Sequence, residues 1–251
     1  FPDSKKYAIP LSITGASNYS LIPSQRSAIL LLNRSILSSV AKVSGGEGIR
    51  IKPVGMHTKA EWTIQMSAIY SSLTRSNLTT AYLSNGTGGA FYTRISSTAG
   101  IQVKNGRDGD DTWTQMPLQA GKWLHITYVH KDKKTTVYVN GKVQKVFENS
   151  AITFGENSMI VVGNSGYRND YLREIRLWDK ALTESEINDY LYLPMDPATP
   201  HLISYLPLSK EMETKDLKAP AGTENVTTKA RIEYVENVKF PADELVIVNQ
   251  E

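Results

Sequence analysis

Three aspartates gather in one short polar loop, residues 105–113. Asp108, Asp110 and Asp111 supply carboxylate oxygens, the hard ligands that Ca²⁺ prefers. The EF-hand pattern is not met, because its last position, counted from Asp108, is Gln119 rather than a glutamate. The loop therefore predicts either a Ca²⁺ site of another kind or a solvated hairpin loop of turn-forming residues.

A second polar loop, residues 163–171, carries amide, guanidinium, carboxylate and phenol groups. Such groups orient sugar hydroxyls, and an aromatic ring can stack on the apolar face of a sugar. The alternative is that the loop only turns the chain and that its charged side chains are solvated. Trp113, beside the acidic loop, could likewise stack on a sugar or pack at the rim of the fold. The candidate ligand contacts are Trp113, Asn164, Tyr167, Arg168, Asn169 and Asp170. One site built from both loops requires that they converge on one cleft.

The residues that could support catalysis lack the required arrangement. Hydrolysis of a glycosidic bond needs two carboxylates about 5–9 Å apart. Glu184, Glu186 and Asp189 are close in sequence, but they fall in a predicted helix, whose N-terminus favours acidic side chains. None of the 4 histidines lies in a G-x-S-x-G setting. We therefore predict that the chain is not an enzyme.

The histidines also lack the short spacing typical of a zinc centre. His125 lies two residues from Trp123, so on a strand both side chains would point to one face. We interpret His125 as a hydrogen-bonded residue of the sheet. A role as ligand or general base is the alternative.

The composition sets wider limits on function. The 251 residues carry 28 basic and 25 acidic side chains, and this near balance argues against a nucleic-acid surface. Without cysteine, the chain can form neither disulfides nor thiolate metal sites. No apolar run reaches the length of a membrane span. Because the sequence begins with Phe1, we expect any signal peptide or lipid anchor to lie outside it.

Short strands separated by turn residues dominate the rest of the chain, a pattern typical of a sandwich or jelly roll. Residues 123–128 and 136–142 predict two strands closed by a turn at Asn140 and Gly141, which tolerate the positive φ angles required there.

One helix is predicted over residues 183–191. It begins with a capping box, in which Thr183 and Glu186 each bond the backbone of the other, and Pro194 follows its end. The predicted fold class is therefore all-β, an antiparallel β-sandwich with one short helix.

Three motifs together carry a resemblance to a known family. They are Trp123-Leu-His125, Tyr138-Val-Asn-Gly141 and Trp178-Asp-Lys-Ala-Leu-Thr-Glu-Ser-Glu-Ile187. In this order they resemble the LamG-like jelly-roll domain of the concanavalin A-like lectin/glucanase superfamily, over residues 45–217. Residues 201–208 look like the closing strand of that family, with Leu206 where a tryptophan is usual, and Asp216 fits the aspartate that follows.

Two further segments flank this domain. Residues 1–44 combine a predicted linker with strand patterns at 7–14 and 27–33. The stretch 3–14 resembles the end of a small β-sandwich of unknown function that precedes LamG-like domains in surface lipoproteins of bacterial glycan-utilisation systems. Residues 218–251 are predicted to form a C-terminal extension that packs on the sandwich.

The resemblance implies carbohydrate recognition by a non-catalytic module of an exported bacterial surface protein. The E-x-D-x-x-E motif of the glucanase branch does not occur here. The expected partner is a glycan or glycoconjugate, and the expected location is extracellular, at the outer membrane or in the periplasm of a Gram-negative bacterium. The alternative is a structural or protein–protein adhesion domain on the same fold, and a glycoside hydrolase is a third possibility.

Overall fold

The computed structural model describes residues 39–45, 48–53, 55, 59–73, 79–84, 89–104, 113–148, 152, 154–164, 168–191, 193–236 and 238. At residues 79–84, 89–91, 164, 168 and 169 it describes the backbone alone. The predicted strands at 7–14 and 27–33 and the three aspartates of the acidic loop lie outside the described residues. The proposed remnant of a preceding domain therefore stays a prediction.

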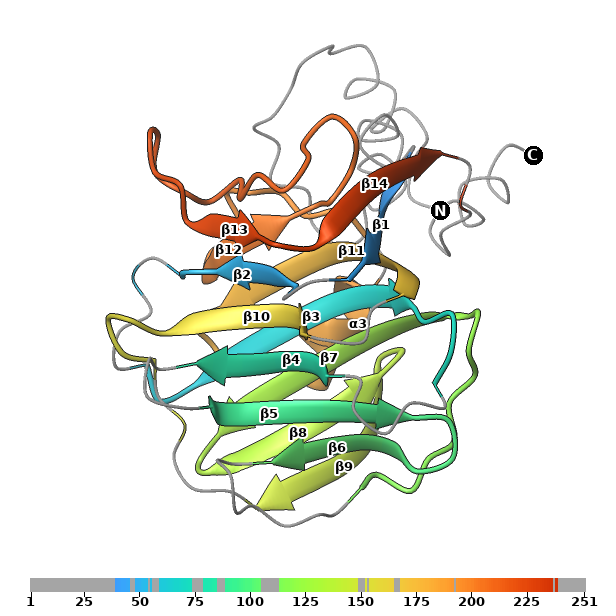
Figure 1. Cartoon of the computed structure of the whole chain (residues 1–251). Coiled ribbons are helices and arrows are strands. Elements are labelled where there is room, and N and C mark those ends of the chain that lie inside the picture. The colour runs from blue at the N-terminus through green and yellow to red at the C-terminus, as the bar shows by residue number, and fades with distance from the viewer. Residues whose placement is uncertain are drawn as a thin grey trace, which may run out of the picture.

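Two antiparallel sheets are stacked face to face (Figure 1). The 8-stranded sheet consists of β14 (Arg231–Glu236), β1 (Ser39–Ser44), β11 (Arg168–Trp178), β3 (Trp62–Ile69), β7 (Trp123–Lys131), β8 (Lys134–Val139) and β9 (Lys142–Glu148), with β12 (Leu202–Leu206) also paired to β11. The 6-stranded sheet consists of β13 (Val226–Thr228), β2 (Ile49–Ile51), β10 (Met159–Asn164), β4 (Thr79–Ser84), β5 (Gly89–Ser96) and β6 (Gly100–Lys104). We call them the large and the small sheet. The prediction of an all-β sandwich is confirmed.

The core lies between the sheets, because side chains alternate between the two faces of each strand. In β3, Ile64, Met66 and Ala68 point into this core and are fully buried. Their neighbours Gln65 and Ser67 therefore face the other side of the large sheet, where they are nevertheless fully buried as well.

A helical segment covers that outer side of the large sheet. Helix α3 (Glu184–Asp189) begins after Thr183, and the predicted capping box with Glu186 is present. Ile187 is fully buried in a second apolar cluster with Trp178 and Tyr205. The helix prediction is confirmed, although the helix ends two residues earlier than expected. None of the described residues forms a helix long and apolar enough to cross a membrane.

The predicted hairpin is correct in its strands and wrong in its turn. Strands β7 and β8 pair as expected, but their turn is at Asp132 and Lys133, where φ is 50° and 61°. Asn140 and Gly141, with φ of 52° and 76°, instead join β8 to β9. The sequence of β9 alternates weakly, so the strand that follows the Asn-Gly turn was not expected.

Strands from outside the predicted 45–217 domain complete both sheets. Strand β1 inserts between β14 and β11, so residues 39–44, part of the predicted linker, form a strand of the large sheet. From the C-terminal side, β14 pairs with β1 and β13 pairs with β2. The division of the chain into three domains itself stays a prediction.

Candidate functional site

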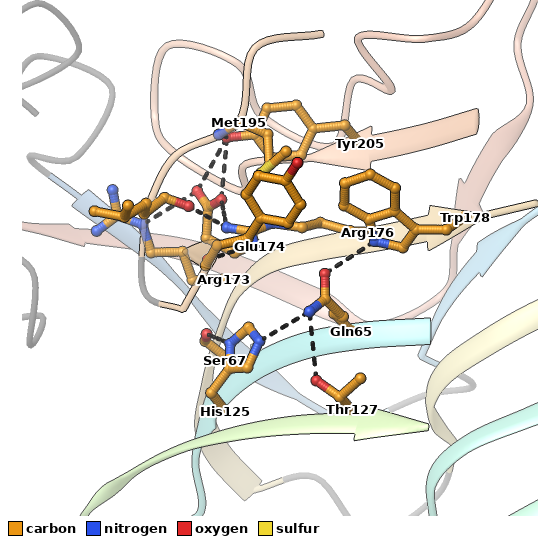
Figure 2. A network of polar contacts seen from close by, with 12 residues as sticks. Gln65, Ser67, His125, Thr127, Arg173, Glu174, Arg176, Trp178, Met195 and Tyr205 are labelled. Carbon is orange, nitrogen blue, oxygen red and sulfur yellow. Dashed lines mark hydrogen bonds and ion pairs between the residues drawn. The ribbon is translucent and has the colours of Figure 1, made fainter. Parts of the chain in front are cut away.

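The motif residues form a buried polar network on the outer side of the large sheet (Figure 2). Trp178 Nε1 donates to Gln65 Oε1 at 2.9 Å. An indole nitrogen can only donate, so this bond fixes the orientation of the Gln65 amide. Gln65 Nε2 then faces His125 Nε2 at 3.4 Å and Thr127 Oγ1 at 3.5 Å.

This arrangement determines the state of His125. Its Nε2 accepts from Gln65, so its proton lies on Nδ1, which donates to Ser67 Oγ at 2.9 Å. Burial lowers the pKa of His125 to about 3, and the positive charge of Arg176 acts in the same direction. The interpretation of His125 as a hydrogen-bonded sheet residue is confirmed.

Arg176 organises a second part of the network. It pairs with Glu174 at 2.7 Å, donates to Tyr190 O at 2.9 Å and also bonds Leu193 O. Both carbonyls lie just after α3, so the guanidinium holds the end of the helical segment on the sheet. Tyr205 donates its hydroxyl to Glu174 at 3.1 Å. Burial and the Glu174 carboxylate raise the pKa of this tyrosine, so it remains a donor.

Glu174 is consequently a structural residue in this fold. It lies in the irregularity of β11 opposite β3, has a φ of 57° and is fully buried. Its carboxylate pairs with Arg173 at 3.8 Å and with Arg176 at 2.7 Å. Together these contacts mean that the motifs identifying the scaffold serve its packing.

Asp216 has a comparable role beside a hollow of about 890 Å³ in the connection between β12 and β13. Its carboxylate accepts four bonds, from Ser204 Oγ, Asn225 Nδ2 and the backbone nitrogens of Tyr205 and Lys218. These donors satisfy the carboxylate, so it fixes the connection, and we assign the hollow no ligand.

The predicted contacts in the 163–171 loop are only partly described. Asn164 ends β10, where its backbone pairs with Thr79, and Arg168 and Asn169 begin β11. Tyr167 lies outside the described residues. Asp170 is fully buried and accepts from the Ser71 backbone nitrogen at 2.6 Å. The structure thus gives Asp170 a packing role, and ligand contact by these four residues and Tyr167 stays a prediction.

The two loops do not start from a shared edge. Every neighbouring pair along β10, β4, β5 and β6 is antiparallel, so β10 and β6 run in opposite directions. The chain therefore leaves β6 after Lys104 and β10 after Asn164 in opposite directions, with two strands between them. The strand register does not support the single cleft that the predicted site required.

Trp113 belongs to a different group of residues, on the outer face of the small sheet. It forms an isolated antiparallel bridge with Gln102 of β6, and Gln102 pairs with Arg94 of β5. Bridge partners share a face, and the neighbouring Ile95 and Ile101 point into the core, so this row faces outward. Tyr92 and Lys104 form the adjacent outward pair. We call these five residues (Tyr92, Arg94, Gln102, Lys104 and Trp113) the β5–β6 cluster.

Arg94 and Tyr92 hold each other within this cluster. Arg94 Nε donates to Tyr92 Oη at 3.0 Å, and the guanidinium carbon lies 5.1 Å from the centre of the ring. This distance is within the range of a cation–π contact. The phenol therefore fixes the position of the guanidinium.

The β5–β6 cluster offers the chemistry expected of a shallow sugar site. It combines two half-exposed aromatic residues, Tyr92 and Trp113, with the half-exposed guanidinium of Arg94 and ammonium of Lys104. Gln102 lies between them in the row but is only 1% exposed, so its amide is covered and offers no contact to a sugar. The sequence predicted Trp113 as a ligand contact, but it did not indicate Tyr92, Arg94 and Gln102. Their alternation with core residues was a usable signal for an outward face. The bridge from Gln102 to Trp113 was not predictable, because it closes across the acidic loop.

No metal site can be built from the part of the chain that is described. Within it, no three His, Asp or Glu side chains lie close enough together to hold an ion. Asp108, Asp110 and Asp111 lie outside that part, so the Ca²⁺ site stays a prediction.

The fold and the motifs define a jelly-roll domain of the lectin type. The family model of the concanavalin A-like lectin/glucanases superfamily matches residues 44–188. The chain belongs to this superfamily.

Solved structures share the fold at low sequence identity. A candidate carbohydrate binding protein from Bacteroides ovatus ATCC 8483 is 19% identical, with a TM-score of 0.59 over 79% of this chain and 60% of that one. The heptameric SAP-like pentraxin from Limulus polyphemus is 12% identical, with a TM-score of 0.56 over 80% and 96% of the two chains. The chain thus spans less than two thirds of the Bacteroides protein. No curated protein matches the sequence.

Proposed function

We propose that this chain is a non-catalytic glycan-binding module whose binding site is the β5–β6 cluster. The observation that carries the proposal is the placement of Arg94 and Trp113 beside Tyr92 on the outer face of the small sheet, with the buried Gln102 between them in the row. A sugar stacks its apolar face on an aromatic ring, while the guanidinium group bonds its hydroxyls.

The chemistry of the small sheet favours binding over hydrolysis. A glycosidase on this fold needs two carboxylates flanking the bond that is cleaved. None of the six strands of the small sheet contains Asp or Glu. In the large sheet, Glu174 and Asp170 are buried and bonded within the protein.

The biological setting forms part of the same proposal. We propose an exported bacterial surface protein of a Gram-negative glycan-utilisation system. The similarity to a candidate carbohydrate binding protein from Bacteroides ovatus supports this setting. Ca²⁺ held by the three aspartates of the acidic loop is also proposed. Loss of glycan binding in EDTA, restored by added Ca²⁺, would support it.

The second candidate function is protein–protein adhesion. The exposed side chains of Val143 and Val146 on β9 favour it, because β9 is the last strand of the large sheet among the described residues and they leave apolar surface at this edge. Such an interaction would not depend on Trp113, which lies on the other sheet.

A glycan array read with and without Ca²⁺ tests the proposal. Binding should be lost in Trp113→Ala and retained in Trp123→Ala, which removes a half-exposed tryptophan from the large sheet instead. Absence of binding to every glycan in both conditions would favour the adhesion domain. Sustained hydrolysis of a polysaccharide that is lost on replacing one carboxylate would overturn both readings.

A further inference from the structure

Acidic residues are distributed unevenly between the small sheet and the rest of the chain. The sequence holds 25 acidic residues, yet all six strands of the small sheet are free of them. Three of these strands carry a basic residue, namely Arg50 in β2, Arg94 in β5 and Lys104 in β6. Arg50 lies between the core residues Ile49 and Ile51, Arg94 precedes the core residue Ile95, and Lys104 follows the core residue Val103. Side chains alternate along a strand, so all three face outward.

Two of these cations lie along one line across the sheet. The register joins Arg50, Val161, Tyr82, Tyr92 and Lys104 in one cross-strand row. With strands about 4.8 Å apart, Arg50 and Lys104 are separated by about 19 Å. This length suits several consecutive units of an extended polymer rather than a single sugar.

The third cation, Arg94, is held in an orientation that suits binding of an anion. Its Nε is bonded to Tyr92 Oη, which leaves the edge formed by its two terminal nitrogens. In the described part of the chain, no acidic side chain pairs with that edge. Two parallel N–H groups match the two oxygens of a carboxylate or a sulfate. Because Tyr92 already fixes the guanidinium, binding an oxyanion costs little additional ordering.

From this geometry we propose that the outer face of the small sheet binds an anionic polysaccharide. Arg94 receives a carboxylate or sulfate group, Tyr92 and Trp113 stack on sugar rings, and Arg50 and Lys104 add attraction along the polymer. The inference rests on the proposed glycan-binding function and narrows it to one class of ligand. Sites for neutral sugars normally use carboxylates to accept hydrogen bonds from sugar hydroxyls. The strands of the small sheet contain no carboxylate, which favours an anionic ligand.

Affinity electrophoresis and calorimetry with four polymers test this proposal. Polygalacturonate carries carboxylates and its methyl ester does not, while dextran sulfate and dextran differ only in sulfate. We expect at least tenfold tighter binding to one charged polymer than to its neutral counterpart, weakened severalfold between 50 and 300 mM NaCl. The charged polymer that binds identifies the group as carboxylate or sulfate.

Matched variants distinguish a specific binding site at Arg94 from non-specific electrostatic attraction. Arg94→Gln should weaken binding to the charged polymer at least tenfold. Lys142→Gln removes the same charge from an exposed position in the large sheet and should leave binding unchanged. Tyr92→Phe keeps the ring but frees the guanidinium, so it should reduce the preference for the charged polymer severalfold. Unfolding curves of all variants confirm that the fold is retained.

Three results would overturn the proposal. Equal losses in Arg94→Gln and Lys142→Gln would mean non-specific attraction, and equal binding of charged and neutral polymers would remove the requirement for an anion. In that second case, binding that still depends on Trp113 would leave the glycan-binding function intact. Failure to bind either charged polymer would overturn the anionic class, and the glycan array would then decide whether the broader function stands.

Discussion

Asn188 lies so close to Gly141 that a Cβ on the glycine would be 2.1 Å from Asn188 Oδ1. The asparagine also donates to Gly141 O at 3.2 Å. The turn between β8 and β9 is thereby docked on helix α3. This contact explains why the Asn-Gly turn and the capped helix, distant in sequence, occur together as motifs of one fold.

Gly141→Ala should destabilise the protein for two reasons. Its φ of 76° is unfavourable for alanine, and the added methyl would overlap with Asn188. We expect a loss of about 2–4 kcal/mol in the free energy of unfolding, measured in urea. Gly121→Ala is the control, because Gly121 has a φ of 73° with nothing near its Cβ position, so only the backbone cost remains. Equal losses in the two variants would show that the contact with Asn188 is unimportant.

Arg176→Met should destabilise the protein strongly. It removes the partner of the buried Glu174 and the donors to Tyr190 O and Leu193 O. Leaving a buried charge unpaired typically costs about 3–5 kcal/mol. Adding Glu174→Gln to this variant should recover part of the loss in urea unfolding, since the uncompensated carboxylate disappears. No recovery in the double variant would indicate that the lost carbonyl bonds, rather than the charge, dominate.

Acid should destabilise the fold through two buried histidines. Burial lowers the pKa of His130 to about 4, and its Nε2 accepts from the Ile152 backbone nitrogen at 3.2 Å. The pKa of His125 is about 3, again chiefly because of burial. An unfolded histidine titrates near 6.5, so below that pH the unfolded chain binds protons that the folded protein does not.

The contribution of the two neutral histidines to the free energy of unfolding should therefore be fully present above about pH 6.5. As the pH falls from there toward the folded pKa values, the free energy of unfolding should decrease by at most about 1.4 kcal/mol per pH unit for each histidine. Urea unfolding at pH 7.5, 6.0 and 5.0 measures this slope. His130→Gln should reduce the slope by about half between pH 6.5 and 5. An unchanged slope in this variant would exclude His130 as a cause.

Thr183→Ala should weaken the start of α3. The hydroxyl of Thr183 accepts from the Glu186 backbone, and the Glu186 carboxylate accepts from the Thr183 backbone. Loss of such a cap costs about 0.5–2 kcal/mol. Ser185→Ala, at an exposed position in the first turn of the same helix, removes a hydroxyl without removing the cap and should change the unfolding free energy by less. A Thr183 variant as stable as the Ser185 variant would argue against the capping box as a stabilising feature.

Local sequence signals predicted local structure well. The capping box, the alternating strands and the positive φ at Asn140 and Gly141 are determined by neighbouring residues. The motif residues predicted the fold because they contact one another through Gln65, Arg176 and Asn188.

The features that could not be predicted from the sequence depend on strand pairing between distant residues. The strand register between β5, β6 and Trp113 depends on pairings that close across loops, so the neighbours of Trp113 could not be read from spacing. The placement of β1 beside β14 joins residues from both sides of the predicted domain. The burial of Asp170 follows from its bond to Ser71, which is distant in the sequence.

The antiparallel pairing of β1 and β14 brings Ser39 opposite Glu236. The start of β1 and the end of β14 therefore lie side by side, on the side where both strands lie in Figure 1, away from β5 and β6. A force applied at Ser39 and Glu236 would open this strand pair one bond at a time, as a zipper opens, instead of loading all its bonds together. The β5–β6 cluster, at the far side, would remain undisturbed through the first steps of such an opening.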